Sequence, residues 1–278
     1  MGKKILLPTD FSNSSWNAIQ YAIKLFENRD CDFYILNTYA KDAHGLESHI
    51  VLDPDDAFNR MSDNRSREGL GDILERLSVI DKDINHRFHV ISRSALFLDA
   101  VNTVVENLQI DMIVMGAKGM TNAHGRKYGK KTLGVIERVR KCPVLVIPKN
   151  VTFNRPEEIV LATNFNTDFK VSEIVYLAEI ARISNASIQI LSMSDNGTLT
   201  PQQKKNKMLI RKYLKDVNHS FNVLPNVKMA SALSCFVEIR HSNMISYIDK
   251  KTSIWEWLGF GKPNLGKLGY YENVPVLA

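Results

Sequence analysis

Ile5-Leu6-Leu7-Pro8-Thr9-Asp10-Phe11 opens the chain with a short apolar run that passes directly into a polar turn. A run of this length is typical of a strand that is buried on both faces of a parallel sheet. The residues after the turn carry apolar side chains at helical spacing, and Ser12 or Ser14 could cap this helix. The sequence therefore predicts a strand, a turn and a helix at its start.

Strands and helices continue to alternate along the first 150 residues. Further strands are expected at 33–36, 88–92, 112–115 and 143–147, and helices at 12–26, 57–80, 96–108 and 132–140. Gly69 and Gly71 weakly interrupt the second helix, and the polar segment 40–56 is expected to form a loop. This alternation predicts right-handed crossovers and a parallel sheet.

The pattern then starts again at Ile159-Val160-Leu161-Ala162-Thr163-Asn164-Phe165. Four later segments also match in the same order: 21–22 with 177–178, 34–36 with 189–191, 111–113 with 243–245, and 142–145 with 274–277. Agreement at five ordered points indicates a duplication. We therefore expect an α/β protein with two tandem open parallel five-stranded sheets and flanking helices. The expected domains are 1–150 and 151–278.

Length and composition fit two ordinary globular domains, since the chain has 278 residues and 24% charged residues. The sequence contains no run of about 18 apolar residues, so it predicts no membrane span. The first residues lack the apolar core of an export signal, and the three cysteines lie far apart in the sequence. These features predict a cytoplasmic protein without a disulfide framework, a zinc site or a membrane partner.

Positive charge is concentrated in one short segment. Residues 116–149 contain nine Lys and Arg and one Glu, whereas residues 1–115 carry more acidic than basic side chains. A focal charge favours an anion site over an extended nucleic-acid surface, so nucleic acid is not expected as a partner. A solvated basic helix face would explain the same composition.

Ligands of open parallel sheets bind at the carboxyl ends of the strands, where the strand order reverses. The first strand ends at Pro8-Thr9-Asp10, and the fourth ends at Met115-Gly116-Ala117-Lys118-Gly119. Glycines allow the backbone to approach a phosphate closely, and Gly129 precedes a helix whose first N–H groups could bind an anion. Asp10 could accept hydrogen bonds from a ribose or an adenine, or could cap the first helix. Positive side chains that could surround a bound phosphate are Lys118, Arg126, Lys127, Lys130 and Lys131.

Three of these motifs resemble the universal stress protein family: PTDFS after the first strand, the spacing Gly116-x2-Gly119-x9-Gly129, and the closing KCPVLVIP. The resemblance covers essentially the whole chain as two tandem units. It implies a Rossmann-like fold of the adenine nucleotide alpha hydrolase type that binds ATP or another adenine nucleotide, with Mg²⁺ only alongside the nucleotide. By this resemblance, the residues flanking the adenosine are Pro8, Asp10, Asn37 and Thr38, and those lining the phosphates are Met115, Gly116, Gly119 and Gly129.

The sequence also departs from the family pattern. Lys130 stands where nucleotide-binding members have Ser or Thr, and a lysine can meet a phosphate but cannot serve a magnesium ion. Thr132, two positions on, could take over the hydroxyl role. In the second unit Ala162 and Asn164 replace the proline and aspartate, and no glycine pair follows Tyr247.

The residues indicate neither catalysis nor metal binding. The seven histidines have no metal-ligand spacing, and no carboxylate pair divides acid and base roles. We therefore expect a cytoplasmic stress-response regulator that binds a nucleotide in its first domain and is not an enzyme. The alternative is a non-nucleotide interaction scaffold with unspecified protein partners. In either case the resemblance implies that Val144–Ile147 pairs with Val274–Leu277 within the chain, and a homodimer is also open.

Overall fold

The computed structural model describes residues 2–39, 54–82, 85–118, 128–163, 165–166, 169–192, 199–224, 229–247 and 274–278. The side chains of 54–60, 229–230 and 234 are not described. The first half contains β1 (Lys3–Pro8), α1 (Asn13–Leu25), β2 (Cys31–Tyr39), α2 (Pro54–Ile80), β3 (His86–Ser94), α3 (Phe97–Leu108), β4 (Met112–Gly116), α4 (Lys130–Arg138) and β5 (Val144–Ile147). The second half contains β6 (Glu158–Ala162), α5 (Val171–Ser184), β7 (Ser187–Ser192), α6 (Pro201–Tyr213), β8 (His219–Val223), α7 (Met229–Ile239), β9 (Met244–Ser246) and β10 (Val276–Leu277).

All ten of these strands form one sheet in the order β3-β2-β1-β4-β5-β10-β9-β6-β7-β8. Every neighbouring pair is parallel except β5 and β10, which are antiparallel. The α/β class and the parallel character predicted from the sequence are confirmed. The two expected sheets are continuous with each other, and the domain boundary at residue 150 stays a prediction.

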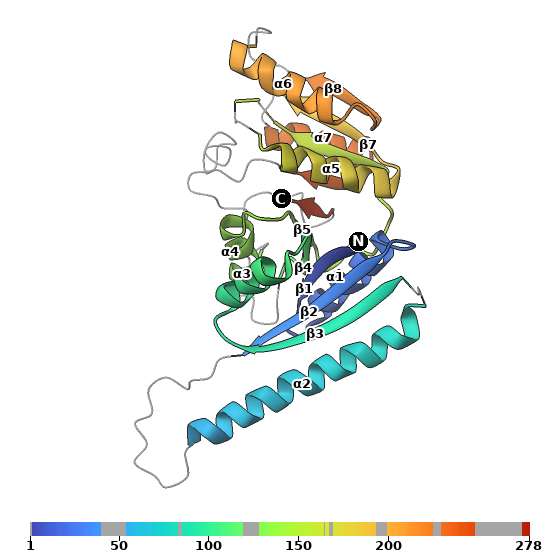
Figure 1. Ribbon diagram of the computed structural model, residues 1–278. Coiled ribbons are helices and arrows are strands. Elements are labelled where there is room, and N and C mark those ends of the chain that lie inside the picture. The colour runs from blue at the N-terminus through green and yellow to red at the C-terminus, as the bar shows by residue number, and fades with distance from the viewer. Residues whose placement is uncertain are drawn as a thin grey trace.

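Two helical layers cover the sheet (Figure 1). Buried side chains of α1, α2, α5 and α6 form one core, and those of α3, α4 and α7 form the other. Each core contains residues of both halves, because β5 and β10 bring the two sets of strands together. No helix among the described residues is long and apolar enough to cross a membrane. The helices α2 and α6 lie at opposite ends of the molecule (Figure 1).

Two predicted helix boundaries differ from the structure. The second helix begins at Pro54 rather than at residue 57, and it runs through Gly69 and Gly71 without a break. Proline is favoured in the first turn of a helix because its missing N–H has no partner there in any case. The fourth helix begins at Lys130, directly after Gly129, rather than at residue 132.

The turn after the first strand has the same geometry in both halves. Phe11 and Phe165 both have a left-handed backbone, with φ of 65° and 60°. Each donates its N–H to the hydroxyl of the threonine two residues earlier, Thr9 or Thr163, at 3.0 Å. The threonine hydroxyl therefore holds a conformation that a phenylalanine adopts only at a cost in free energy.

The residue before the fourth strand of each half has a matching role. A carboxylate oxygen of Asp111 accepts a hydrogen bond from the N–H of Lys4 at 2.9 Å. The amide oxygen of Asn243 accepts from the N–H groups of Glu157 and Glu158 at 2.9 and 3.3 Å. Both side chains thus cap the start of the neighbouring first strand, which fits the sequence match between 111 and 243.

The two halves join through backbone hydrogen bonds. Val144 and Ala278 exchange N–H···O bonds of 2.7 and 2.9 Å, and Val276 lies opposite Val146. This pairing of the last strands confirms the prediction made from the resemblance. The connecting segment packs against the first half, since the amide nitrogen of Asn17 donates to the carbonyl of Val151 at 2.8 Å.

We expect opposite effects on stability when alanine replaces two glycines of the first half. A Cβ at Gly116 would lie 2.6 Å from the hydroxyl oxygen of Ser14 and 2.9 Å from its carbonyl oxygen, whereas a Cβ at Gly71 would meet nothing within 4 Å. Gly116→Ala should therefore lower the free energy of unfolding by about 1–3 kcal/mol. Gly71→Ala, on the exposed side of α2, should raise it by about 0.5–1 kcal/mol. Urea unfolding monitored by circular dichroism measures both; equal effects would contradict the close approach of α1 to β4.

Candidate functional site

The strand order reverses between β1 and β4. On one side of β1 lie β2 and β3, and on its other side lie β4 and β5. Leu6 of β1 lies opposite Ile113 of β4. The first and fourth strands are thus neighbours, so their carboxyl ends lie at the same edge of the sheet. We call the predicted ligand residues at the carboxyl ends of these strands the switch-point site. Its described members are Pro8, Thr9, Asp10, Asn37, Thr38, Met115, Gly116, Lys118, Gly129, Lys130, Lys131 and Thr132. Gly119, Arg126 and Lys127 lie outside the described residues.

Asp10 supports the first helix without capping it directly. The cap of α1 is Ser12, whose hydroxyl oxygen accepts a hydrogen bond from the N–H of Ser15 at 3.2 Å. A carboxylate oxygen of Asp10 in turn accepts from the hydroxyl of Ser12 at 2.6 Å and from its N–H at 3.2 Å. Of the three caps that the sequence offered, Asp10, Ser12 and Ser14, it is therefore Ser12 that caps the helix.

The ends of β1 and β2 are tied together by Asn37. Its side-chain nitrogen donates to the carbonyl oxygen of Thr9 at 2.8 Å, and both residues are more than 90% buried. Because a buried amide and carbonyl satisfy each other, the polypeptide that carries Asp10 is fixed to the neighbouring strand. Asn37 therefore has a structural role whether or not it meets a ligand. Thr38 follows it and is half-buried.

Tyr39 and Asp63 connect the end of β2 to α2. The Tyr39 hydroxyl donates to a carboxylate oxygen of Asp63 at 2.9 Å. Burial, and then this carboxylate, raise the pKa of Tyr39, whereas the hydrogen bond from Tyr39 lowers the pKa of Asp63. The tyrosine therefore stays protonated and keeps its role as donor at neutral pH.

Gly116 ends β4 where α1 passes very close. Its missing side chain leaves room for Ser14, which is 4% exposed and whose hydroxyl has no hydrogen-bond partner among the described residues. A glycine is therefore required here by helix packing alone, before any phosphate is considered. Met115, one residue earlier, is buried in the core on the opposite face of the sheet.

Two hydrogen bonds close the stem of the glycine-bearing loop. The N–H of Gly129 donates to the carbonyl of Ala117 at 2.8 Å, and the hydroxyl of Thr132 donates to the carbonyl of Gly116 at 3.0 Å. Thr132 is 3% exposed, so its hydroxyl serves the stem and does not face solvent. The start of α4 is thereby held against the end of β4.

The first turn of α4 carries positive charge and backbone N–H groups that no described side chain caps. Gly129 is the N-cap residue and provides no side chain to cap the N–H groups behind it. Lys118 and Lys130 have no acidic partner in the described part of the chain, and the Nζ of Lys131 lies 5.1 Å from the ring centre of Phe97. Helix N-termini favour anions, so this arrangement fits the phosphate end of a nucleotide.

Sequence reasoning missed Ser14, Ser15 and Ala117. Ser15 shares a 3.0 Å hydrogen bond with the hydroxyl of Thr9, which helps to fix the turn after β1. The run Ser12-Asn13-Ser14-Ser15 carries a signal for a helix cap but none for the packing of Ser14 against Gly116. Ala117 acts through its backbone, and backbone roles leave no signal in side-chain chemistry.

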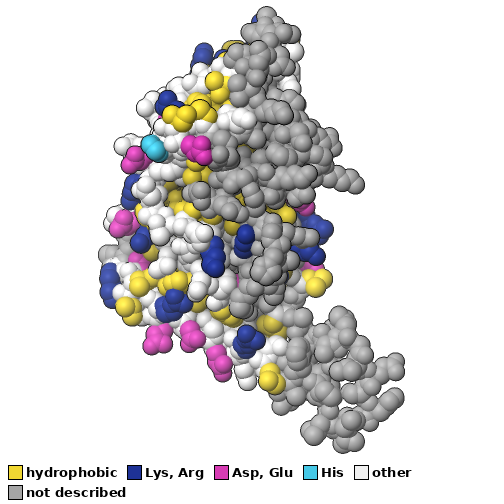
Figure 2. All heavy atoms as spheres, turned by 180° about the vertical axis from the view of Figure 1, so that it is seen from behind, with side chains coloured by type: hydrophobic (Ala, Val, Ile, Leu, Met, Phe, Trp, Pro, Cys, Tyr) yellow, Lys and Arg dark blue, Asp and Glu magenta, His cyan; other side chains and the backbone are white. Residues whose placement is uncertain are grey.

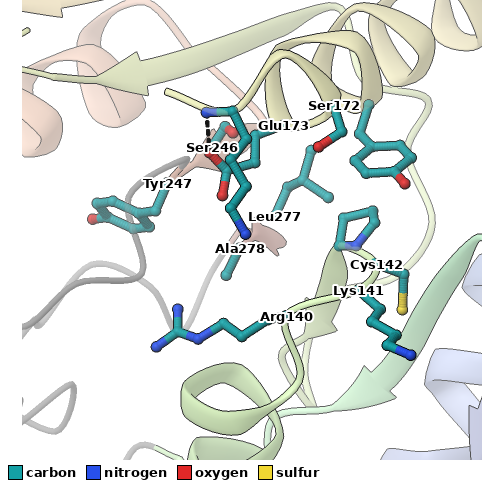
Figure 3. A pocket seen from close by; sticks show the side chains of 12 residues that line it. Arg140, Lys141, Cys142, Ser172, Glu173, Ser246, Tyr247, Leu277 and Ala278 are labelled. Carbon is teal, nitrogen blue, oxygen red and sulfur yellow. Dashed lines mark hydrogen bonds between the residues drawn. The ribbon is translucent and has the colours of Figure 1, made fainter. Parts of the chain in front are cut away.

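A separate pocket lies where the two halves meet (Figure 3). It is lined by the segment before β5, the start of α5, the end of β9 and the last residues of the described chain: Arg140, Lys141, Cys142, Pro143, Lys170, Ser172, Glu173, Tyr176, Ser246, Tyr247, Leu277 and Ala278. None of the residues of the switch-point site lines it. One charge of this pocket is paired, since Lys141 lies 3.0 Å from a carboxylate oxygen of Glu106. Glu173 accepts a hydrogen bond from the backbone N–H of Lys170 at 3.1 Å.

Known proteins resemble the chain in sequence and in fold. The Universal stress protein family matches residues 1–148, which is more than half of the chain. The chain belongs to the universal stress protein family. A universal stress protein of Methanocaldococcus jannaschii is 26% identical over 147 residues, which are 53% of this chain and 82% of that protein.

Two solved structures span nearly the whole chain. A universal stress protein from Archaeoglobus fulgidus aligns with a TM-score of 0.67 at 14% identity, over 99% of this chain and 97% of that one. A functionally unknown protein from Pseudomonas aeruginosa aligns with a TM-score of 0.54 at 11% identity, over 99% and 92%. At these identities the likeness concerns the fold, and it extends over both halves.

We expect the hydroxyl of Thr132 to matter for stability. Thr132→Val keeps the shape of the side chain but leaves the buried Gly116 carbonyl without its donor, which should cost about 1–2 kcal/mol in the free energy of unfolding. Thr103→Val removes a similar bond, from a hydroxyl to the carbonyl of Asp99 at 2.7 Å, in a solvent-accessible place. That control should change stability by less than about 0.5 kcal/mol. Urea unfolding of both variants measures the two changes in the free energy of unfolding. An equally small decrease for Thr132→Val would show that the hydrogen bond of Thr132 is not needed for stability.

Proposed function

We propose that the switch-point site binds an adenine nucleotide, and that this binding regulates the protein without catalysis. The observation that carries the proposal is the meeting of three features at one edge of the sheet: Asp10 after β1, the glycine that ends β4, and the N-terminus of α4, which no described side chain caps. A carboxylate suits the hydroxyl and amino donors of a nucleoside, and the helix N-terminus suits phosphates. The carboxylate and the helix N-terminus thus complement the nucleoside and the phosphates of a nucleotide.

The residues present support phosphate binding better than magnesium binding. Lys118 and Lys130 supply point charges that no acidic group pairs with among the described residues, whereas the Thr132 hydroxyl donates to the carbonyl of Gly116. A phosphate could meet these lysines and the N–H groups of the first turn of α4. Magnesium would then be held by the nucleotide and water more than by the protein.

We also propose that the chain arose as two copies of one unit, with boundaries at 1–150 and 151–278. The left-handed phenylalanines, their threonine partners and the capping side chains Asp111 and Asn243 support this division. The second copy keeps the turn after its first strand but not the glycine motif of residues 116–129. Its role would be to complete the sheet.

Asp10→Ala should separate nucleoside recognition from phosphate binding. Isothermal titration of the full chain should show ATP binding that weakens at least about tenfold in the variant, because a charge-assisted hydrogen bond to the nucleoside is lost. Binding of inorganic triphosphate should be unchanged. If neither ATP nor triphosphate binds the wild-type protein at millimolar concentration, the interaction-scaffold alternative replaces this proposal.

Lys130→Ser should strengthen ATP binding if the loop follows the family pattern. The hydroxyl can donate to a phosphate and face a magnesium ion, which the ammonium group cannot do. Titration with ATP in the presence and absence of Mg²⁺ measures the change, which we expect to be larger with Mg²⁺. Lys149→Ser, an exposed lysine after β5, is the control for loss of charge. Unchanged affinity would show that Lys130 is not what distinguishes this loop.

A further inference from the structure

The outward face of α6 carries charge of one sign. The helix contains Lys204, Lys205, Lys207, Arg211 and Lys212, and no acidic residue. None of these five side chains pairs with an acidic group in the part of the chain that the structure describes. Elsewhere, basic and acidic side chains lie interspersed over the described part of the face that Figure 2 shows.

An apolar side chain lies at the centre of this charge. Met208 is 70% exposed. Its four neighbours on the helix surface, three and four residues away in each direction, are Lys204, Lys205, Arg211 and Lys212, and all are exposed. We call Met208 and these four cations the α6 face. It extends over about two turns of helix, or roughly 12 Å.

The α6 face is held rigidly by the rest of the protein. The hydroxyl of Thr200 accepts from the N–H of Gln203, and the side chain of Gln203 accepts in return from the N–H of Thr200. Ile210 is fully buried, and the side chain of Asn206 donates to the carbonyl of Phe165 at 2.8 Å. The cations are therefore presented on a fixed scaffold, which lowers the entropy lost when a partner binds.

The corresponding helix of the first half lacks this pattern. On α2, Met61 is also exposed, at 72%, but the residues three and four positions after it are Asn64 and Arg65. Further along, Arg65, Glu68 and Asp72 mix both signs on the exposed side. The ring of cations around a methionine is thus particular to α6 and does not follow from the shared fold.

We propose that the α6 face docks an acidic segment of a partner protein in which carboxylates flank an apolar side chain. The cations match the carboxylates, and Met208 supplies the apolar contact at the centre that protein interfaces favour. A nucleic-acid backbone or a phospholipid surface would use the cations, but it would make no specific use of a central methionine. The proposal is independent of nucleotide binding.

Fluorescence anisotropy with the full chain tests the proposal. The probe is a labelled ten-residue peptide of Glu and Asp with two central leucines. The comparison ligands are the same peptide with serines in place of the leucines, a short DNA duplex, and phosphatidylserine vesicles. We expect the leucine peptide to bind most tightly and to weaken as salt rises from 0.05 to 0.5 M, by about tenfold or more.

Two variants with matched controls identify the surface. Lys204→Glu with Lys212→Glu should weaken binding of the leucine peptide about tenfold or more, while Lys24→Glu with Lys149→Glu makes the same change of charge elsewhere and should have less than about a twofold effect. Met208→Ser should weaken the leucine peptide about fivefold and leave the serine peptide unchanged. Met61→Ser should change neither.

Three results would overturn the proposal. One is equal weakening by the two charge-reversal pairs, which would indicate a response to net charge alone. Another is no effect of Met208→Ser. The third is tighter binding of the duplex or the vesicles than of the leucine peptide. Circular dichroism confirms that each variant is folded, and unchanged ATP titrations separate this surface from the switch-point site.

Discussion

The antiparallel pairing of β5 with β10 is the contact on which the rest of the architecture depends. Each half by itself is an open sheet whose last strand would expose unpaired N–H and C=O groups. Because Val144 and Ala278 bond to each other, these two edges disappear and both hydrophobic cores continue from one half into the other. Only β3 and β8 are left as outer strands of the described sheet. The charged helix α6 and the long helix α2 lie near these two ends.

The switch-point site contains residues that the fold itself needs. Gly116 is needed because Ser14 lies where its Cβ would be, and Asn37 is needed because it holds the carbonyl of Thr9. The second half provides an internal comparison. Thr163 and Phe165 repeat the turn of Thr9 and Phe11 although no glycine motif follows. The turn therefore belongs to the fold, whereas Lys118 and Lys130 are residues whose chemistry the fold does not require.

Much of the fold could be predicted because parallel strands buried on both faces leave continuous apolar runs, as at Ile5–Leu7. The order of the repeated segments then predicted a duplication. The helix through Gly69 and Gly71 was not predicted as continuous, because tertiary contacts decide it: Leu70 and Leu77 are buried on the sheet, and Gly69 leaves room for the ring of Phe11. The α6 face was missed for a simpler reason. Its charge was averaged over a half that also contains many acidic residues, although the helix itself contains none.

The pairing of β5 with β10 also has a consequence for synthesis on the ribosome. Val146 and Val276 are partners in the sheet, yet about 130 residues separate them, which corresponds to on the order of ten seconds of translation. During that interval β5 is the open edge of a nascent first half. Neighbouring ribosomes on one messenger carry identical edges at that stage. The tandem architecture therefore requires that the second half be synthesised and paired with β5 before two such edges meet.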